Sequence, residues 1–248
     1  MREINTQAFL EDTFKVIDNV LEQQADNIRE AGAICANAIK NGGVIQVFGT
    51  GHSVGFGMEM QGRPGSLVPV HTMNISDFVT SGMYTLEEFR DMDNIFERRP
   101  GVASKFFDLY EISDQDVFII ISNSGINGLV IDLAAAAKER NHKVIVVTSL
   151  DHTLNSDSRH PSGKKLMDFG DVVIDNCGPK GDAMLDLADG GKIGSVSSLS
   201  GIYVAQGVAL ETIKNLQDLE ELPVLVFEEN EASKKQNDEL KEKYRGRI

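Results

Sequence analysis

Three short segments of small polar residues follow apolar runs of the chain and could together bind an anion. They are 49–53 (Gly-Thr-Gly-His-Ser), 122–127 (Ser-Asn-Ser-Gly-Ile-Asn) and 148–149 (Thr-Ser). Small residues let backbone N–H groups approach oxygen atoms closely, and a helix that begins at such a segment favours negative charge at its first turn. Serine, threonine and asparagine are also common helix N-caps, so a purely structural role stays open for each segment taken alone.

Two residues in or near the first segment could transfer protons. His52 and Glu59 are seven positions apart, so they would lie on one face of a helix that runs through Gln61, about 10 Å apart along its axis. An aldose–ketose isomerase needs a base that moves a proton between neighbouring carbon atoms and a second acid–base group that opens the ring. At this separation both cannot act on one carbon atom unless one of them serves the site of a neighbouring subunit. An ion pair between Glu59 and Arg63 is the structural alternative.

A third candidate, His160, lies in the segment 158–164 (Ser-Arg-His-Pro-Ser-Gly-Lys). Arg159 and His160 stand beside two serines, where they could contact an anion or supply the ring-opening group. The same segment could equally be an ordinary solvated turn. The five histidines of the chain show no H-x-x-x-H spacing, so the sequence predicts no metal site.

The first segment does not fit a nucleotide cofactor. The dinucleotide fingerprint G-x-G-x-x-G needs glycine at position 54, which is occupied by Val54, and the expected acidic residue is missing where the second strand ends, near His71. The run 162–165 (Ser-Gly-Lys-Lys) lacks the upstream glycine and the strand of a phosphate-binding P-loop. We therefore expect no cofactor.

The charge of the chain limits its partners. With 24 Lys and Arg against 38 Asp and Glu, the net charge is −14, which argues against nucleic acid or an anionic membrane as a partner. An anion site in such a protein must rely on backbone N–H groups and hydroxyls rather than on a basic cluster. Cys35 and Cys177 are too few for a disulfide framework. The absence of a signal-peptide pattern and of an apolar run approaching roughly 20 residues leads us to expect a cytoplasmic protein.

Apolar strands that alternate with helices must position the three segments. Continuous apolar strands in such an order are typical of a parallel sheet covered on both faces, so the expected fold class is α/β, a three-layer αβα sandwich. Ligands of these sheets bind beyond the carboxyl ends of the strands, where the three segments lie. The region 74–97 is expected to be loop with short helices. The expected strands are 44–48, 67–71, 116–121, 144–147 and 171–174. One helix is expected after the first segment and ends at 61. The other expected helices are 102–110, 129–139, 197–215 and 231–244.

The first forty residues predict a long helix before the first strand. Gly32 is expected to bend or break it, and Asn41-Gly42-Gly43 to end it. Its apolar stripe either packs on its own domain or forms a subunit interface. The stripe consists of Leu10, Phe14, Ile17, Leu21, Ala25 and Ile28. We expect one domain over 1–248, with 1–41 as a helical arm, 42–216 as the α/β core and 217–248 as a charged tail with a helix.

Several stretches taken together resemble a known family. Residues 47–53 (Val-Phe-Gly-Thr-Gly-His-Ser) and 121–127 (Ile-Ser-Asn-Ser-Gly-Ile-Asn) are similar to the loops of the SIS (sugar isomerase) domain, whose members bind phosphosugars. More narrowly, the chain resembles an uncharacterised group of bacterial SIS proteins related to phosphoheptose isomerases. Further matching stretches are 54–70, 97–98, 158–160, 162–164, 174–182 and 237–248.

The resemblance implies both an assembly and a phosphate site. It implies a five-stranded parallel sheet with flavodoxin-like strand order, in a homodimer or a pair of dimers. In SIS domains the loop S-x-S-G-x-T holds the phosphate of the sugar. Ser122, Ser124 and Gly125 match this loop, and Asn127 stands where threonine is usual.

The resemblance also extends to the flanking loops. Ser53 matches the serine after the first strand, and Ser197 or Ser198 matches the Ser/Thr that opens the last helix. Phosphoheptose isomerases carry a catalytic glutamate on the helix after the first loop, which Glu59 approximates at a shorter spacing. The predicted catalytic residues are therefore Glu59, His52 and His160. The predicted ligand-binding residues are Thr50, Gly51, Ser53, Ser122, Asn123, Ser124, Gly125, Asn127, Thr148, Ser149, Arg159 and Ser198.

Three functions are compatible with these residues. The first is an enzyme on phosphorylated sugars, either an aldose–ketose isomerase or a related lyase or epimerase. The second is a non-catalytic phosphosugar-binding module that acts as a sensor, although SIS sensors usually carry a DNA-binding domain and the charge of −14 disfavours direct DNA contact. The third is an assembly partner that acts through its N-terminal helix and charged tail.

Overall fold

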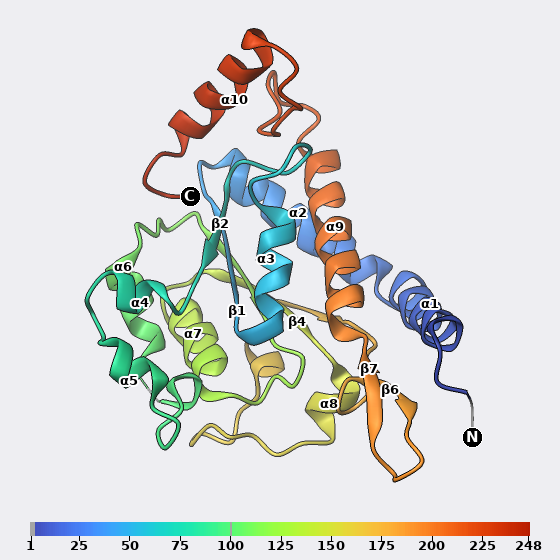
Figure 1. The fold of residues 1–248 in the computed structure, drawn as a ribbon. Coiled ribbons are helices and arrows are strands. Elements are labelled where there is room, and N and C mark those ends of the chain that lie inside the picture. Colours follow the sequence, from blue (N-terminus) through green and yellow to red (C-terminus); the bar gives the residue numbers. More distant parts are fainter. Residues whose placement is uncertain (1–2, 100) are drawn as a thin grey trace.

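A five-stranded parallel sheet forms the centre of the computed structural model, which describes residues 3–99 and 101–248 (Figure 1). The strand order is β2-β1-β3-β4-β5, so the α/β class and the flavodoxin-like order are confirmed. The strands are β1 (Ile45–Gly49), β2 (Val70–Met73), β3 (Val117–Ile121), β4 (Lys143–Thr148) and β5 (Val172–Asp175).

Alternate residues of the buried strands face two separate apolar layers. Val47 and Ile119 point to the layer of α2 (Ala25–Lys40), α3 (Val54–Met60) and α9 (Ser197–Asn215). Phe48 and Ile120 point to the layer of α7 (Gly128–Glu139) and of the short helices α4 (Asp77–Thr80) and α6 (Phe106–Leu109). Because both faces are covered, the central strand β3 is apolar throughout and the core of β4 is apolar too, which makes these strands recognisable in the sequence.

The region between β2 and β3 is organised by aromatic packing. Phe78, Phe96 and Phe106 are buried, with Tyr84 and Phe89 against them. The predicted helix over 102–110 is a short 3₁₀ turn, η3 (Ala103–Lys105), followed by α6. The other short elements here are α5 (Leu86–Arg90) and η2 (Phe96–Arg98).

The N-terminal helix breaks at Gln24 and not at the predicted Gly32. Gln24 separates α1 (Thr6–Gln23) from α2, and its buried side-chain oxygen accepts hydrogen bonds from Asn27 (2.8 Å) and from the backbone of Asp175 (3.1 Å). Gly32 lies inside α2 and lets this helix approach α9 closely, because a Cβ at this position would lie 2.5 Å from Cβ of Glu211. The glycine therefore serves close helix packing.

The apolar stripe of α1 is only partly covered by its own chain. The buried side of α1 carries Val16 and Val20, whereas Leu10, Phe14 and Leu21 are 42%, 55% and 56% exposed. Packing of the whole stripe on its own domain, one of the two alternatives, is thus not found. The exposed residues of the stripe are compatible with the second alternative, a subunit interface.

The segments after β4 and after β5 contain elements that the sequence did not predict. A short helix, α8 (Leu150–Leu154), and a 3₁₀ turn, η4 (Leu166–Phe169), precede β5. An antiparallel hairpin, β6 (Ala183–Asp186) with β7 (Lys192–Ser195), lies between β5 and α9. Its strands have no long apolar run, which is why the sequence did not indicate them.

The charged tail packs against the end of the sheet opposite the three polar segments. Leu225, Leu240 and Tyr244, the last two on and just after α10 (Glu231–Lys243), contact Val44 and Val68. In Figure 1, α10 lies beyond this end of β1 and β2. No helix in the described ranges 3–99 and 101–248 is long and apolar enough to cross a bilayer.

A buried ion pair joins the tail to the sheet. The carboxylate of Asp116, with no exposed surface, accepts a hydrogen bond from the Arg247 guanidinium at 2.5 Å and from the backbone of Val44 at 2.9 Å. Gln46 donates to its other oxygen at 2.9 Å, and the ring of His71 bonds to Gln46 at 2.8 Å. Burial lowers the pKa of His71, so the ring is held neutral at physiological pH.

Replacing Arg247 by alanine is expected to destabilise the protein by about 3–5 kcal/mol, because a buried carboxylate loses its cation. Urea denaturation measures the change in free energy of unfolding. Arg245→Ala is the control, since Arg245 forms an exposed pair with Glu242 and should change stability by less than about 1 kcal/mol. Equal losses in the two variants would contradict a structural role for the Arg247–Asp116 pair.

Candidate functional site

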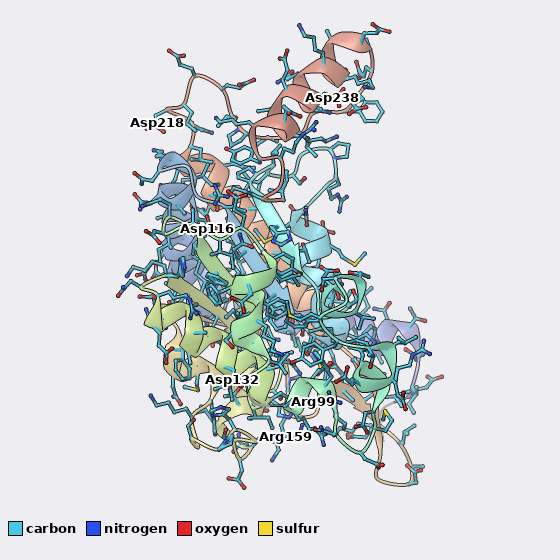
Figure 2. All side chains as sticks on the ribbon, turned by 90° about the vertical axis from the view of Figure 1, so that its left-hand side faces the viewer. Arg99, Asp116, Asp132, Arg159, Asp218 and Asp238 are labelled. Carbon is cyan, nitrogen blue, oxygen red and sulfur yellow. The ribbon has the colours of Figure 1, made fainter. Side chains whose placement is uncertain are left out.

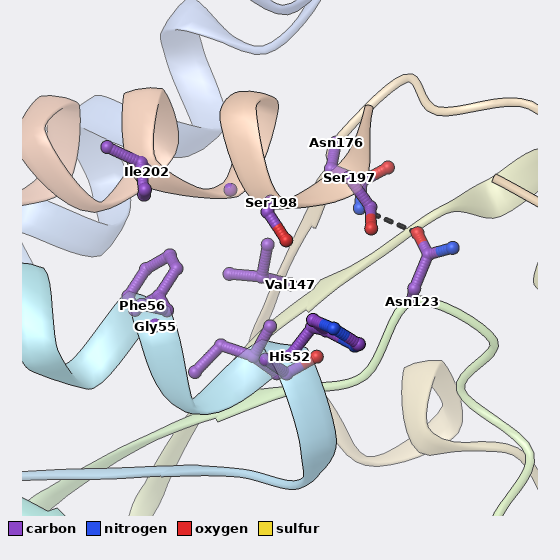
Figure 3. A pocket seen from close by; sticks show the side chains of 12 residues that line it. His52, Gly55, Phe56, Asn123, Val147, Asn176, Ser197, Ser198 and Ile202 are labelled. Atoms are coloured by element: carbon purple, nitrogen blue, oxygen red, sulfur yellow. Dashed lines mark hydrogen bonds between the residues drawn. The ribbon is translucent and has the colours of Figure 1, made fainter. Parts of the chain in front are cut away.

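A pocket lies at the carboxyl ends of the strands, between the start of α3 and the start of α9 (Figure 3). It brings together four residues predicted from the sequence: His52, Ser53, Asn123 and Ser198. They come from the loops after β1 and β3 and from the first turn of α9. The other lining residues are Gly55, Phe56, Ile121, Val147, Asn176, Ser197, Gly201 and Ile202.

The lining divides into an apolar side and a polar rim. Ile121 and Val147 end two core strands, and Phe56 and Ile202 extend this apolar surface on the helices. Within the described residues, no hydrogen bond engages the ring of His52 or the hydroxyls of Ser53 and Ser198. Such a mixture of apolar wall and unpaired polar groups is typical of a small-molecule site.

The loop after β3 packs closely against the side chains of Thr148 and Thr153. Gly125 has φ +64°, and its N–H donates to the hydroxyl of the buried Ser122 at 3.1 Å. A Cβ at Gly125 would lie 2.8 Å from the hydroxyl of Thr153 and 2.9 Å from that of Thr148. Glycine is therefore required here for both conformation and space.

Thr148 and Ser149 lie beneath this loop and not on the pocket surface. Both have no exposed surface. Thr148 donates to the carbonyl of Asn123 at 3.3 Å, and Ser149 donates to the carbonyl of Gly178 at 2.6 Å. Direct ligand contact, as predicted for these two residues, is thus corrected to support of the loops that line the site.

Arg159 joins the end of the same loop at the first turn of α7. Its guanidinium donates to the side chain of Asn127 at 2.8 Å, and its N–H donates to the carbonyl of Ile126 at 3.0 Å. Asn127 precedes α7 without capping it through its side chain. Ser124 is partly exposed beside it. This group provides hydroxyl, amide and guanidinium donors at a helix N-terminus, which favours an anion.

His160 does not lie in the pocket with His52. Its Nε2 bonds to Asp132 on α7 at 2.8 Å and its Nδ1 to the hydroxyl of Ser162 at 2.7 Å. Helix α7 covers the sheet face opposite α3 and α9. Figure 2 shows Asp132 near Arg159, far from the tail. The predicted catalytic grouping of His160 with His52 is therefore not found within one chain, because His160 turns toward Asp132.

Glu59 also lies outside this pocket. Its carboxylate accepts hydrogen bonds from Arg63 at 2.6 Å and from Gln206 on α9 at 2.5 Å, in a separate depression at the far end of α3. The ion pair with Arg63, the structural alternative, is present. Glu59 and His52 therefore do not share a site in one subunit.

Glu97 is an acidic group near the site that the sequence reasoning did not select. Its carboxylate accepts a hydrogen bond from the hydroxyl of Thr50 at 3.0 Å. The turn η2, which carries Glu97, packs against the start of α7, where a Cβ on Gly128 would lie 3.4 Å from the carbonyl of Arg98. The only signal in the sequence was the resemblance of Glu97-Arg98 to the family.

The first turn of α9 is already occupied by a carboxylate. Asp182, with φ +71°, accepts hydrogen bonds from the N–H groups of Val196 and Ser197 (3.0 and 2.7 Å) and from the hydroxyl of Ser197 (2.8 Å). The favourable interaction between anion and helix N-terminus is used internally here. Ser198 remains the free hydroxyl of this turn.

The comparison with known proteins identifies the family. A model of the SIS domain matches residues 8–149. The chain belongs to the SIS domain family. A UPF0309 protein of Listeria innocua is 36% identical over 242 residues, which cover 97% of this chain and 96% of the relative, so the chain also belongs to the UPF0309 family.

Solved structures of SIS proteins share the fold. The phosphoheptose isomerase GmhA of Neisseria gonorrhoeae has a TM-score of 0.54 at 17% identity, over 82% of this chain and 94% of that protein. A phosphoheptose isomerase of Francisella tularensis has a TM-score of 0.53 at 14% identity, over 83% and 95%. At these identities the likeness concerns the fold.

The pocket of this SIS domain is neutral at its rim. None of its lining residues is Lys, Arg, Asp or Glu.

Burial and the nearby Asp175 raise the pKa of the Cys177 thiol to about 11, so it is protonated at neutral pH and is no thiolate nucleophile. Among residues 3–99 and 101–248, no three His, Cys, Asp or Glu side chains are grouped as metal ligands would be.

Gly125→Ala is expected to destabilise this SIS domain by about 2–4 kcal/mol, because the new Cβ adds a steric clash to the positive φ. The control is Gly163→Ala: Gly163 has φ +72° but open space around it, so only the backbone cost of about 1–2 kcal/mol applies. Urea denaturation of both variants measures the difference. A loss at position 125 no larger than that at 163 would show that the contacts with Thr148 and Thr153 do not constrain the loop.

Proposed function

We propose that this SIS domain binds a phosphorylated sugar in the pocket between α3 and α9 and interconverts its aldose and ketose forms. The observation that carries this proposal is the convergence of His52, Ser53, Asn123 and Ser198 on one pocket at the carboxyl edge of the sheet. The apolar wall of Phe56 suits the carbon face of a sugar, and the polar rim suits its hydroxyls. The shared fold of two phosphoheptose isomerases supports the substrate class.

Charge distribution favours a particular position for the phosphate. Asp182 occupies the N-terminus of α9, so a phosphate there would meet a carboxylate. The N-terminus of α7 instead offers Ser124, Asn127 and the cation of Arg159. We therefore place the phosphate at the loop 122–127 and the sugar toward His52 and Ser198.

The acid–base roles follow from what lies near that sugar. His52 is exposed and has no partner among the described residues, so its ring is free to take a proton from a sugar carbon. Glu97, whose carboxylate accepts a hydrogen bond from Thr50 in the loop after β1, serves as the second acid–base group. Glu59 could serve only the site of a neighbouring subunit.

The alternative function is binding without turnover, as in a sensor; a lyase or epimerase would use the same two groups on a different bond. The uncharged rim residues and His52 are sufficient to bind a phosphosugar without turnover, which supports the sensor as the alternative function. Phosphosugars are charged and do not cross bilayers unaided, so either function would place the protein in the cytoplasm.

Thermal unfolding with fructose 6-phosphate, glucosamine 6-phosphate and sedoheptulose 7-phosphate tests this proposal. A ligand that binds the native state at 100 times its Kd stabilises it by about 2.7 kcal/mol and raises Tm. The same sugars without phosphate are the control and should give a smaller rise. A protein whose Tm responds to none of the three contradicts phosphosugar binding, and a rise in Tm without aldose–ketose interconversion would favour the sensor.

We further propose that two copies of the chain associate through the exposed apolar residues of α1, α3 and α9. Ile202 is both exposed and part of the pocket wall, so a second copy seated on α9 would help to close the site. These exposed residues are Leu10, Phe14, Leu21, Met58, Leu199, Ile202 and Leu210.

Phe14→Glu is expected to shift this association toward monomer, because a charge would be buried at the interface. Light scattering at two protein concentrations measures the mass. Asn19→Glu, an exposed polar position of α1, is the matched control and should leave the mass unchanged. A monomeric wild-type protein would remove the shared interface altogether.

A further inference from the structure

We infer that Asn176 is a positioning residue that turns the side-chain amide of Asn123 so that its NH₂ group, and not its carbonyl, faces the ligand. The pocket then selects an oxygen that accepts hydrogen bonds at this place, from the sugar or from its phosphate. This inference deepens the proposed function and rests on phosphosugar binding in the same pocket.

The direction of each amide follows from a backbone donor. The N–H of Gly178 can only donate, and it bonds to Oδ1 of Asn176 at 2.9 Å. The other end of that amide, Nδ2 of Asn176, therefore faces Asn123 and donates to its Oδ1 at 2.9 Å. Figure 3 shows this bond at the edge of the pocket. This bond leaves both N–H groups of the Asn123 NH₂ without a partner among the described residues.

Asn176 is itself held from several sides. It is 3% exposed, and its N–H donates to the carbonyl of Thr148 at 2.8 Å. Asp175 accepts hydrogen bonds from the N–H groups of Cys177 (2.9 Å) and Leu150 (3.0 Å), and these bonds hold the turn after β5. Cys177 has φ +56°, an uncommon conformation for a residue other than glycine. This turn lets Gly178 reach back to Asn176.

The buried hydroxyl of Ser149 completes the arrangement. It donates to the carbonyl of Gly178 at 2.6 Å and so fixes the peptide that orients Asn176. A Cβ on Gly178 would lie 3.0 Å from Oδ1 of Asn176, so a larger residue would displace this oxygen by a few tenths of an ångström. Ser149, Gly178 and Asn176 together determine which end of the Asn123 amide is free.

A donor with a fixed direction has a chemical consequence for the ligand. No described residue bonds to Nδ2 of Asn123, and the residue is one of those that line the pocket. A preorganised donor needs no reorientation when an oxygen arrives, so it binds an acceptor more strongly than a freely rotating amide does. A group that can only donate at this position would be rejected.

Asn176→Asp tests the inference by reversing the amide. Aspartate still accepts the N–H of Gly178, but its second oxygen now requires a donor from Asn123, whose carbonyl would then face the ligand. We expect the Kd of the phosphosugar that gives the largest rise in Tm among the three tested above to increase about 5- to 100-fold. Inorganic phosphate is measured in parallel to identify the acceptor. If Asn123 donates to a phosphate oxygen, Asn176→Asp also weakens the binding of inorganic phosphate; if it donates to a sugar oxygen, the binding of inorganic phosphate is unchanged.

A double-mutant cycle separates this effect from simple charge repulsion. In an Asn123→Ala background the amide is gone, so Asn176→Asp should change the Kd less than about twofold. An equal loss in both backgrounds would overturn the inference, since the new charge would then act on the ligand directly. Wild-type protein that binds no phosphosugar would instead count against the proposed function.

A measurement without ligand tests the amide orientation by itself. In ¹H–¹⁵N spectra, the side-chain NH₂ signal of Asn123, assigned by its loss in Asn123→Ala, should move downfield in Asn176→Asp as it becomes hydrogen-bonded. An unchanged signal in a folded variant, with Tm within a few degrees of wild type, would overturn the inference. Asn19→Asp, remote from the site, is the matched control for the added charge and should not move this signal.

Discussion

The parallel arrangement of the five strands is the constraint on which the site depends. Because every strand runs the same way, every loop that follows a strand emerges at one edge of the sheet. Residues as distant in sequence as His52, Asn123, Asn176 and Ser198 are thereby brought to one pocket. The core strands position these loops through burial of their apolar side chains alone. The loop residues can therefore be polar and contact a ligand.

This arrangement also explains how an acidic protein can hold an anion. The N-termini of α9 and α7 are used differently: Asp182 satisfies that of α9, whereas that of α7 is flanked by Asn127 and Arg159. In the proposed binding mode, the negative group of the ligand lies at one end of the pocket and its neutral part at the other. The asymmetry arises from a single aspartate in a left-handed conformation.

Much of the fold could be predicted because burial on both faces makes β3 and β4 continuously apolar, and helix α9 spans the predicted 197–215. Pocket residues could be predicted where they follow a predicted strand closely, as His52 and Asn123 do, and where the family resemblance marked them, as for Ser198. Within one chain Glu59 and His160 lie outside the pocket and bond to Gln206 and Asp132, which come from remote elements that local spacing cannot reveal. Asn176 was missed because its role depends on a backbone turn at Cys177, which carries no glycine to mark it.

The ion pair between Asp116 and Arg247 has a consequence for the order of folding during synthesis. Asp116 precedes β3, and its cation lies 131 residues further along the chain. At about 5–20 residues per second, the ribosome needs roughly 7–26 seconds to add that stretch. Until then the sheet would contain a buried carboxylate without its cation, so the sheet reaches its full stability only after residue 247 has been added.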